Sequence, residues 1–495
     1  ATSSAIIYRF LMALGIDAPI YIPDRLSEGY GPNIDALKQL RDQGADILLM
    51  LDCGTTAFDV VKAGTELGLK IIIIDHHEAE DTLPDCWHVI NPKRKDDHSA
   101  LDMLAAAGVS FMVCVAINAR LRDRQYYKNN NMVEPKLKSL LDIVALGTVC
   151  DMVPLLGVNR LFVRAGFATP ENQMNFGIQA LMNVAGITPP INTYDCGFVL
   201  GPRINAGSRV HKADLGARLL TLDNKEECQN IAWTLNDCND KRKAIQIEME
   251  EQAIAMVEDK GMQDDPIILV AHEDWHPGLS GLVAGRLKER YNKPSCVVTF
   301  AHDLSGHKEG RGSGRSIPSI HIAQSFIDAR NAGLLSKGGG HAMAGGFTIE
   351  PENIDKLHEF LKSHISKQME NTNTNIETNI DGALTTNGIT VNLVELLQNK
   401  IGPFGQEQPE PIFLLEKVRI HKADILGGAH IKVMISDWEG GTRIKAMAFR
   451  AVDTSLGDAL LRAGTKSLNI LGQLKINEWQ GRKTAEMHII DASYS

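Results

Sequence analysis

The segments ILLMLDCGTT at residues 47–56 and KIIIIDHH at residues 70–77 decide the fold of the N-terminal part of the chain. Each contains a short apolar run that ends in an aspartate, Asp52 in the first segment and Asp75 in the second. A helix-length segment separates the two runs. This β-α-β pattern predicts two buried parallel strands. Because the carboxyl ends of parallel strands form the ligand crevice of an open α/β sheet, we expect Asp52 and Asp75 to lie close together.

A metal site is predicted at this crevice. Asp75 is followed by His76 and His77, and the largely apolar run at residues 141–149 is followed by Asp151, which we interpret as a third strand-end acid. Three carboxylates would repel one another unless a cation lay between them. Carboxylates favour hard cations such as magnesium, and an added imidazole shifts the preference toward manganese. The Asp-His-His tripeptide alone is explained equally well by a capping loop.

Length, charge and cysteine usage limit the class of protein. The 495 residues predict roughly three domains at about 150 residues each. A net charge of −10 excludes a polycation that binds nucleic acid by bulk charge. The eight cysteines include no C-x-x-C pair, which argues against a zinc ribbon or a disulfide framework and favours the reducing cytoplasm. The longest weakly polar stretch, residues 103–117, is too short for a membrane span and predicts a buried helix.

The predicted fold class is α/β with a C-terminal β barrel. We expect a doubly wound domain over residues 1–220, a long connector helix over 221–262, and a second α/β domain over 263–368. An Asn- and Thr-rich linker is expected over 369–388, followed by a small barrel of the OB type over 389–495.

Several motifs, in this order and spacing, resemble those of the DHH phosphoesterase family. They are residues 51–55, 75–77, 91–92 and 147–154, that is LDCGT, DHH, NP and GTVCDMVP. Further motifs resemble the RecJ-type single-strand exonucleases within that family: GPRINAG at 201–207, WHPG at 275–278, GLVAGRL at 281–287, GSGRS at 312–316 and GGGHAMAGG at 338–346. The resemblance covers nearly the whole chain.

The resemblance implies roles for the crevice residues. Asp52 is expected to bridge two Mn2+ or Mg2+ ions, and His76 and Asp151 to complete the coordination. Asp75 is expected to orient the neighbouring imidazole, and His77 to face the scissile phosphate. The family's first motif, Asp-x-Asp-Gly, would end where this sequence begins at Ala1. We therefore expect a trimmed chain, inactive as given, with a naturally inactive relative as the alternative.

Candidate phosphate ligands lie in three later segments. Arg203, Asn205 and Arg209 suit a phosphate clamp, although a hydrogen-bond network at a domain interface is the competing explanation. The other candidates are His276, Ser313, Arg315 and His341. Glycines around His341 and near Arg315 predict flexible segments that approach a ligand closely, with a tight structural turn as the alternative. The resemblance assigns residues 263–368 to substrate contact, as a DHHA1 domain.

The sequence predicts a metal-dependent exonuclease that degrades single-stranded DNA from the 5′ end, in DNA repair and recombination. The direction and the DNA preference come from the resemblance alone, as do a single-strand-binding protein or a RecQ-type helicase as partners. One alternative is a DHH phosphoesterase of short oligonucleotides or cyclic dinucleotides. The other is a non-catalytic DNA-binding scaffold. A basic strip of Lys432, Arg443, Lys445 and Arg450 is expected on the barrel.

Overall fold

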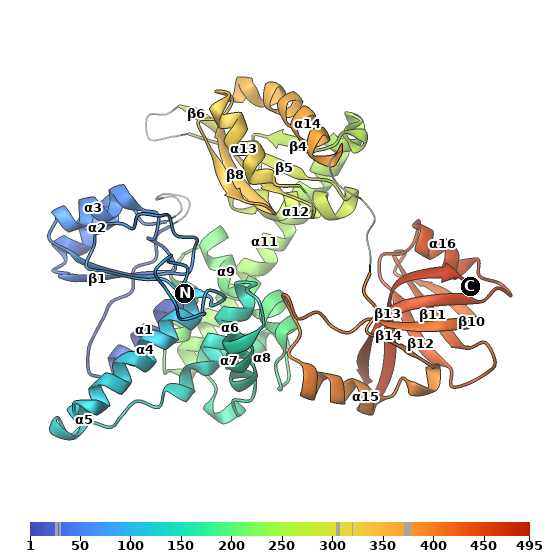
Figure 1. The fold of residues 1–495 in the computed structure, drawn as a ribbon, viewed down its shortest axis with the longest axis horizontal. Helices are drawn as coiled ribbons and strands as arrows, with labels where there is room; N and C mark the ends of the chain where they lie inside the picture. The colour runs from blue at the N-terminus through green and yellow to red at the C-terminus, as the bar shows by residue number, and fades with distance from the viewer. Residues whose placement is uncertain (25–27, 29–30, 303–306, 319, 371–377) are drawn as a thin grey trace. The chain divides into compact units, whose positions relative to one another are not determined.

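The structure is a computed structural model, and it describes all residues except 25–27, 29–30, 303–306, 319 and 371–377 (Figure 1). The chain forms two compact units. The first comprises Ala1–Asp102, Ala106–Gly147 and Thr169–Thr374, and the second comprises Met103–Ala105, Thr148–Ala168 and Asn375–Ser495. Residues 148–168, which fall within the predicted 1–220 domain, thus cluster with the C-terminal part.

The first unit begins with a three-stranded parallel sheet in the order β1-β2-β3. Its strands are β1 Ile47–Leu51, β2 Lys70–Ile74 and β3 His88–Ile90. Helix α3, Phe58–Glu66, packs closely on this sheet, since a Cβ atom at Gly64 would lie 2.7 Å from Ile71. The β-α-β prediction is therefore confirmed, with Asp52 and Asp75 at the carboxyl ends of adjacent strands.

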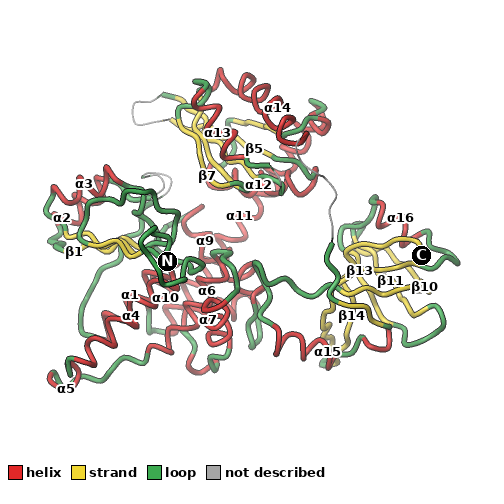
Figure 2. The backbone as a smooth tube through the Cα atoms, viewed as in Figure 1, coloured by secondary structure: helices red, strands yellow, loops and turns green. Residues whose placement is uncertain are grey.

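Helices make up most of the remaining N-terminal part of the chain (Figure 2). They are α1 Thr2–Ala13, α2 Ile34–Asp42, α3 Phe58–Glu66, α4 Ala106–Asp123, α5 Tyr126–Asn129, α6 Leu141–Cys150, α7 Gly157–Phe167, α8 Phe176–Ala185, α9 Gly201–Val210 and α10 Leu215–Thr221. The buried helix expected at 103–117 is α4. The run at 141–149 is helix α6, so the prediction of a third strand there was wrong. No helix in the described part of the chain combines the length and hydropathy of a membrane span.

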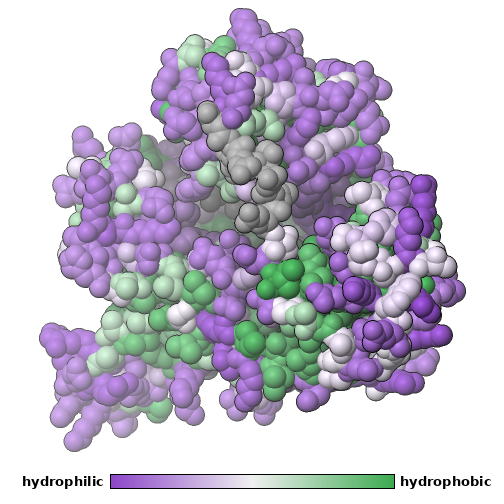
Figure 3. All heavy atoms as spheres, turned by 45° about the vertical axis from the view of Figure 1, so that its right-hand side comes forward, coloured by the Kyte–Doolittle hydropathy of each residue, from purple (hydrophilic) through white to green (hydrophobic). Residues whose placement is uncertain are grey.

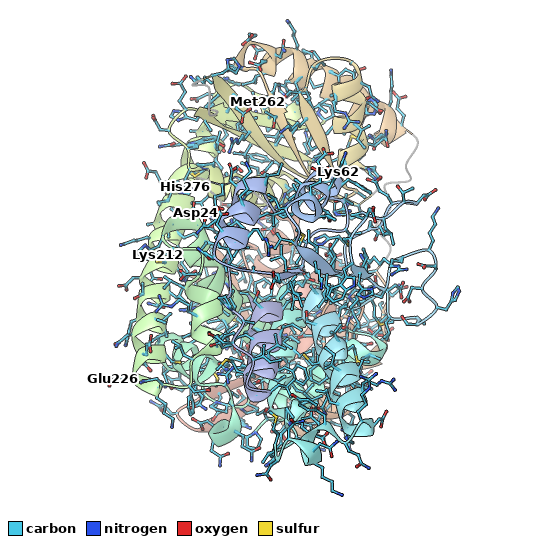
Figure 4. The ribbon with its side chains drawn as sticks, turned by 90° about the vertical axis from the view of Figure 1, so that its left-hand side faces the viewer. Asp24, Lys62, Lys212, Glu226, Met262 and His276 are labelled. Carbon is cyan, nitrogen blue, oxygen red and sulfur yellow. The ribbon has the colours of Figure 1, made fainter. Side chains whose placement is uncertain are left out.

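Helix α11, Lys225–Asp259, confirms the predicted connector. Asn224 caps its first turn by accepting a hydrogen bond from the backbone NH of Glu227 at 3.0 Å. Its C-terminal half packs into the core of the following domain through Met249, Ala253 and Val257. In Figure 4, Glu226 marks the start of the helix and Met262 lies just beyond its end, at the next domain.

The domain after the connector contains a five-stranded mixed sheet in the order β4-β5-β6-β8-β7. Its elements are β4 Ile268–His272, α12 Ser280–Tyr291, β5 Ser295–His302, β6 Lys308–Arg315, α13 Ile322–Asn331, β7 Lys337–His341, β8 Ala344–Ile349 and α14 Ile354–Glu370. The glycine-rich segments predicted as flexible are three paired strands, β6, β7 and β8. Their glycines make room for aromatic rings: a Cβ atom at Gly312 would lie 2.1 Å from the Phe347 ring.

The C-terminal part of the second unit is a sheet in the order β11-β12-β14-β13-β10-β9, and pairing of β10 with β11 closes five strands into a ring. Its elements are β9 Gly382–Leu384, α15 Val391–Leu396, β10 Phe413–Leu426, β11 His430–Asp437, β12 Ile444–Ala448, α16 Ser455–Leu461, β13 Leu468–Trp479 and β14 Arg482–Tyr494. Strand β9 lies inside the predicted 369–388 linker and pairs with β10, whereas residues 371–377 of that linker lie outside the described part.

Hydrophilic side chains dominate the face of the molecule drawn in Figure 3, where hydrophobic residues form separate clusters. The α/β fold class with a connector helix and a C-terminal ring of strands is confirmed.

Candidate active site

The crevice at the ends of β1 and β2 brings Asp52, His76 and His77 together. Asp52 follows β1 directly, with a φ of 63°, and its backbone NH donates to the carbonyl oxygen of Ile74 at 3.0 Å. His76 Nε2 lies 3.3 Å from Asp52 Oδ1. One potential ligand atom from each of the three residues lies within 4.8 Å of the others. A carboxylate with two imidazoles is a donor set suited to a first-row divalent cation.

Asp75 fixes the Asp-His-His motif through hydrogen bonds. It is 1% exposed and accepts hydrogen bonds from the backbone NH of Thr55 at 3.1 Å and from that of His76 at 2.8 Å. Its Oδ1 also lies 2.7 Å from His77 Nδ1. Burial alone would raise the pKa of Asp75, but the hydrogen bonds from His77 and Thr55 hold it well below its ordinary value. Asp75 therefore stays ionised and fixes the His77 ring through Nδ1.

Thr55 and Asn91 support the same arrangement. Asn91 Nδ2 donates to Thr55 Oγ1 at 3.0 Å and to the carbonyl oxygen of His77 at 2.8 Å. Both side chains are almost fully buried. Sequence reasoning gave neither residue a role, although both stand in the motifs at 51–55 and 91–92. That motif context was the only signal available, because the contact joins residues 36 positions apart.

Asp151 does not end a strand. It follows helix α6 in an exposed turn, and the next residue, Met152, has a φ of 57°. It belongs to the second unit, whereas Asp52, His76 and His77 belong to the first. Asp52 and Asp75 each follow a strand, whereas Asp151 follows a helix, so the expectation of a third strand-end acid was wrong.

Cys53 and Cys150, which are next to Asp52 and Asp151 in the sequence, have thiol groups packed against protein atoms. Burial raises the pKa of Cys53 to about 12, with a contribution from the charges of Asp75 and Asp52. Burial likewise raises the pKa of Cys150 to about 12. Because a thiol must ionise to bind a metal, neither cysteine is a good ligand. Cys150 lies at the end of helix α6 rather than on the strand assumed from the sequence.

Ser313 and Arg315 lie on the same face of strand β6, at alternate positions. The Ser280 hydroxyl donates to Ser313 Oγ at 3.0 Å. Arg315 packs over the first turn of α12, where a Cβ atom at Gly281 would lie 2.7 Å from its guanidinium nitrogen. Burial lowers the pKa of Arg315.

His341, at the exposed end of β7, is on the same face of the sheet, because it pairs with Ala344, and Ala344 pairs with Arg315. The pKa of Glu78 is lowered mainly by its hydrogen bond with Lys93, and also by the charges of His341 and His76. The carboxylate of Glu78 thus interacts with one histidine from each of the two sheets.

The arginines of helix α9 are engaged in hydrogen bonds. Arg203 donates from Nε to Asn236 Oδ1 at 3.0 Å and from a terminal nitrogen to the carbonyl oxygen of Val199 at 2.8 Å. Arg209 donates to the carbonyl oxygen of Gly278. These contacts fit a hydrogen-bond network at a domain interface, which is the alternative to a phosphate clamp. Asn205, by contrast, is exposed.

Arg209 and His276 are brought together near Gly278, whose backbone NH donates to His276 Nδ1 at 3.1 Å. Burial, followed by the Arg209 charge, lowers the pKa of His276. His276 is therefore neutral near pH 7 and holds the turn through Nδ1.

Comparison with known proteins gives the family. The profile of the DHH family, N-terminal domain, matches residues 1–148, that of the DHHA1 domain matches 264–367, and that of the RecJ OB domain matches 380–491. The single-stranded-DNA-specific exonuclease RecJ of Escherichia coli is 33% identical over 99% of this chain and 85% of its own length. The Salmonella typhimurium protein of the same name is 32% identical over the same shares. The chain belongs to the RecJ family.

Solved RecJ structures agree with this assignment. The crystal structure of Thermus thermophilus RecJ in complex with Mn2+ matches with a TM-score of 0.79 and 25% identity, over 99% of this chain and 67% of that one. A second RecJ structure, bound to manganese, matches with a TM-score of 0.61 and 27% identity, over 75% of this chain and 89% of that one. Divalent metal binding by RecJ proteins fits the carboxylate and imidazole donors of Asp52, His76 and His77.

Proposed function

We propose that this protein is a metal-dependent exonuclease that degrades single-stranded DNA from the 5′ end and acts in DNA repair and recombination. The observation that carries the proposal is the cluster of Asp52, His76 and His77, fixed by the buried Asp75. A divalent cation bound there would activate water and stabilise charge on the phosphate. The names and Mn2+-bound structures of the RecJ relatives support this chemistry.

The proposed roles of the crevice residues follow the sequence expectations. Asp52, His76 and Asp151 would hold the Mn2+ or Mg2+ ions, with Asp52 proposed as the ligand that two ions share. Asp75 is a positioning residue that fixes His77 through Nδ1, and His77 contacts the scissile phosphate. The 2.7 Å contact between Asp75 and His77 supports this division of roles.

Phosphate binding is proposed for the α/β domain over 263–368 and for helix α9. Ser313, Arg315 and His341 share one face of the sheet, and that face is bare at Gly339, where a Cβ atom would meet nothing within 4 Å. The backbone of a DNA strand can approach such a surface closely. The proposed phosphate ligands also include His276, Arg203, Asn205 and Arg209. Arg203 and Arg209 would bind phosphate while keeping their hydrogen bonds to Asn236 and Gly278.

The ring of strands over 389–495 is proposed to hold single-stranded DNA through contacts of its own. Its strand order is that of an OB fold, which binds oligonucleotides on its second and third strands and adjoining loops. Of the proposed basic strip, Lys432 and Lys445 already pair with Asp424 and Glu486. Arg443 and Arg450 are exposed and supply the remaining charge. Trp479, 71% exposed at a hairpin end, offers a surface for base stacking.

A single-strand-binding protein or a RecQ-type helicase is proposed as the partner, in the cytoplasm, on family resemblance. The test of the proposed activity uses the full-length protein with Mn2+ on three substrates: single-stranded DNA, blunt duplex and a cyclic dinucleotide. We expect mononucleotides from single-stranded DNA only. Hydrolysis of the cyclic dinucleotide alone would favour the small-substrate phosphoesterase, and binding to DNA without hydrolysis would favour the scaffold.

A further inference from the structure

A local excess of positive charge lies at the far end of helix α4. Residues 119–139 carry six lysines and arginines and only two acids, in a chain whose net charge is −10. We call this segment the basic tip. It consists of the last turns of α4, the short helix α5 and the return segment up to Ser139. In Figure 1, α5 lies at the end of α4 that is remote from the sheet of β1.

The basic tip is held by a buried polar network. Asn118, 2% exposed, accepts a hydrogen bond from Tyr127 Oη at 2.5 Å and donates to Glu134 Oε1 at 2.8 Å. Arg122 also binds Glu134. The network ties α4, α5 and the return segment together, so the tip has a defined shape. Arg122 and Glu134 form an exposed ion pair, so this cation of the tip already has an acidic partner.

The other five cations of the tip are presented to solvent. Arg120, Arg124, Lys128, Lys136 and Lys138 are all exposed. Within the part of the chain that the structure describes, their side chains form no ion pair. Arg124 directly follows α4, and its backbone NH donates to the carbonyl oxygen of Arg120 at 3.1 Å, so this turn continues the helix and places the two arginines on one face. Tyr126, 37% exposed, lies beside them with its ring edge-on to Tyr127.

Stabilisation of the α4 dipole explains only part of this charge. Cations in the last turn of a helix are favourable, which accounts for Arg120 and Arg122. Lys136 and Lys138 lie outside α4 and α5 and receive no such benefit. Five exposed like charges in so short a segment repel one another, which a polyanion would relieve.

We propose that the basic tip binds the phosphate backbone of the DNA substrate, at nucleotides beyond those held at the metal site. The proposal rests on the proposed nuclease function and adds a contact to it. Helix α4 has 18 residues and spans about 27 Å at 1.5 Å per residue. Its first turn is packed inside the unit, since a Cβ atom at Gly147 would lie 2.6 Å from Ala107. The tip therefore adds binding without touching the residues near the base of the helix.

The test replaces Arg120, Arg124 and Lys128 by glutamine together in the full chain. A matched control replaces Lys62, Lys260 and Lys356, three exposed lysines from separate elements, and so changes the net charge equally. Equilibrium binding of a long oligothymidylate is measured against salt concentration. A duplex with a 5′ single-stranded tail is measured in parallel, which separates contact with the single strand from contact with the duplex.

We expect the tip variant to bind at least one of these substrates more weakly, with the slope of log K against log salt reduced by about 2 for three lost single-strand contacts. The control variant should retain the slope of the wild type, and both variants should cut a saturating short oligonucleotide at the wild-type rate. Equal slopes for the tip variant and the wild type on both substrates would overturn the proposal and leave an acidic protein surface as the binding partner. An equal reduction of the slope in the control variant would also overturn the proposal, because the effect would then come from the net charge alone. If the wild type itself neither binds nor cuts single-stranded DNA, the proposed function fails instead.

Discussion

His77 Nδ1 lies 2.7 Å from Asp75 Oδ1, and this contact decides which side of the imidazole ring is fixed. Asp75 Oδ1 also accepts from the backbone NH of His76 at 2.8 Å. The same carboxylate therefore orders both histidines, one through its ring and the other through its main chain. Because Asp75 is buried, its hydrogen bonds do not compete with water.

Replacing Asp75 by asparagine should reduce metal affinity or hydrolysis by about 10- to 100-fold, the usual effect of losing a carboxylate that orients a histidine ligand. The amide retains the size of the side chain but removes the charge that favours His77 Nδ1 as a donor. The measurement is kcat against Mn2+ concentration. Asp81→Asn, at an exposed acid outside the cluster, is the control and should behave as the wild type. Wild-type manganese dependence in Asp75→Asn would argue against the positioning role.

Two glycines of the same sheet, Gly312 on β6 and Gly339 on β7, should respond differently to replacement by alanine. At Gly312 the added methyl group would lie 2.1 Å from the buried Phe347 ring, so we expect a loss of stability of about 1–3 kcal/mol, typical of overpacking. At Gly339 a Cβ atom would meet nothing within 4 Å. Gly339→Ala should fold normally and bind DNA more weakly, since its methyl group would stand on the face that carries Ser313. Thermal unfolding and DNA binding of the two variants check this, and equal stability of both would contradict the packing argument.

The exposed arginines of the ring of strands should contribute to binding of long DNA. Arg443→Gln combined with Arg450→Gln should weaken binding of a long single strand and lower its salt slope by about 1.4, at 0.7 per phosphate contact. The rate on a saturating short oligonucleotide should not change. The control is Lys417→Gln with Arg462→Gln, elsewhere on the same domain. An unchanged slope in the first variant would indicate that this domain does not hold DNA through these arginines.

Breaking the pair of Lys445 and Glu486 should instead affect folding. Glu486 is 6% exposed, and its carboxylate lies 2.6 Å from Lys445 Nζ and 3.1 Å from His488 Nε2. Lys445→Gln leaves this buried carboxylate with weaker compensation and should destabilise the domain by about 1–3 kcal/mol. Denaturant unfolding measures the change. Lys445→Gln combined with Glu486→Gln should recover part of the loss, and no recovery would show that the charge of Glu486 is not its cause.

The parts of the site that follow from a local sequence pattern could be predicted. Asp52 and Asp75 each follow a short apolar run, and parallel pairing of β1 and β2 brings them to one crevice. The run before Asp151 was misassigned because residues 141–149 are largely apolar, and a short apolar run fits a strand or a helix equally well. Periodicity distinguishes the two only when one face is polar.

The glycine-rich segments were misread for a different reason. Glycine usually indicates a turn, but in β6 the alternate residues Gly310, Gly312 and Gly314 admit the side chains of the core, such as Phe347 and Phe326. That requirement comes from residues distant in sequence. The support of His77 by Asn91 is likewise a tertiary contact with no local pattern.

Asp52 is proposed to hold a divalent cation for hydrolysis of single-stranded DNA. The test follows mononucleotide release from single-stranded DNA labelled at the 5′ or the 3′ end, by the full-length protein and by its Asp52→Ala variant, as Mn2+ is titrated. We expect early release of the 5′ label that requires Mn2+ and stops on chelation. In Asp52→Ala the rate should fall to below about a hundredth of the wild type, while DNA binding persists. Release that survives complete chelation, or a near wild-type rate in Asp52→Ala, would contradict this role of Asp52.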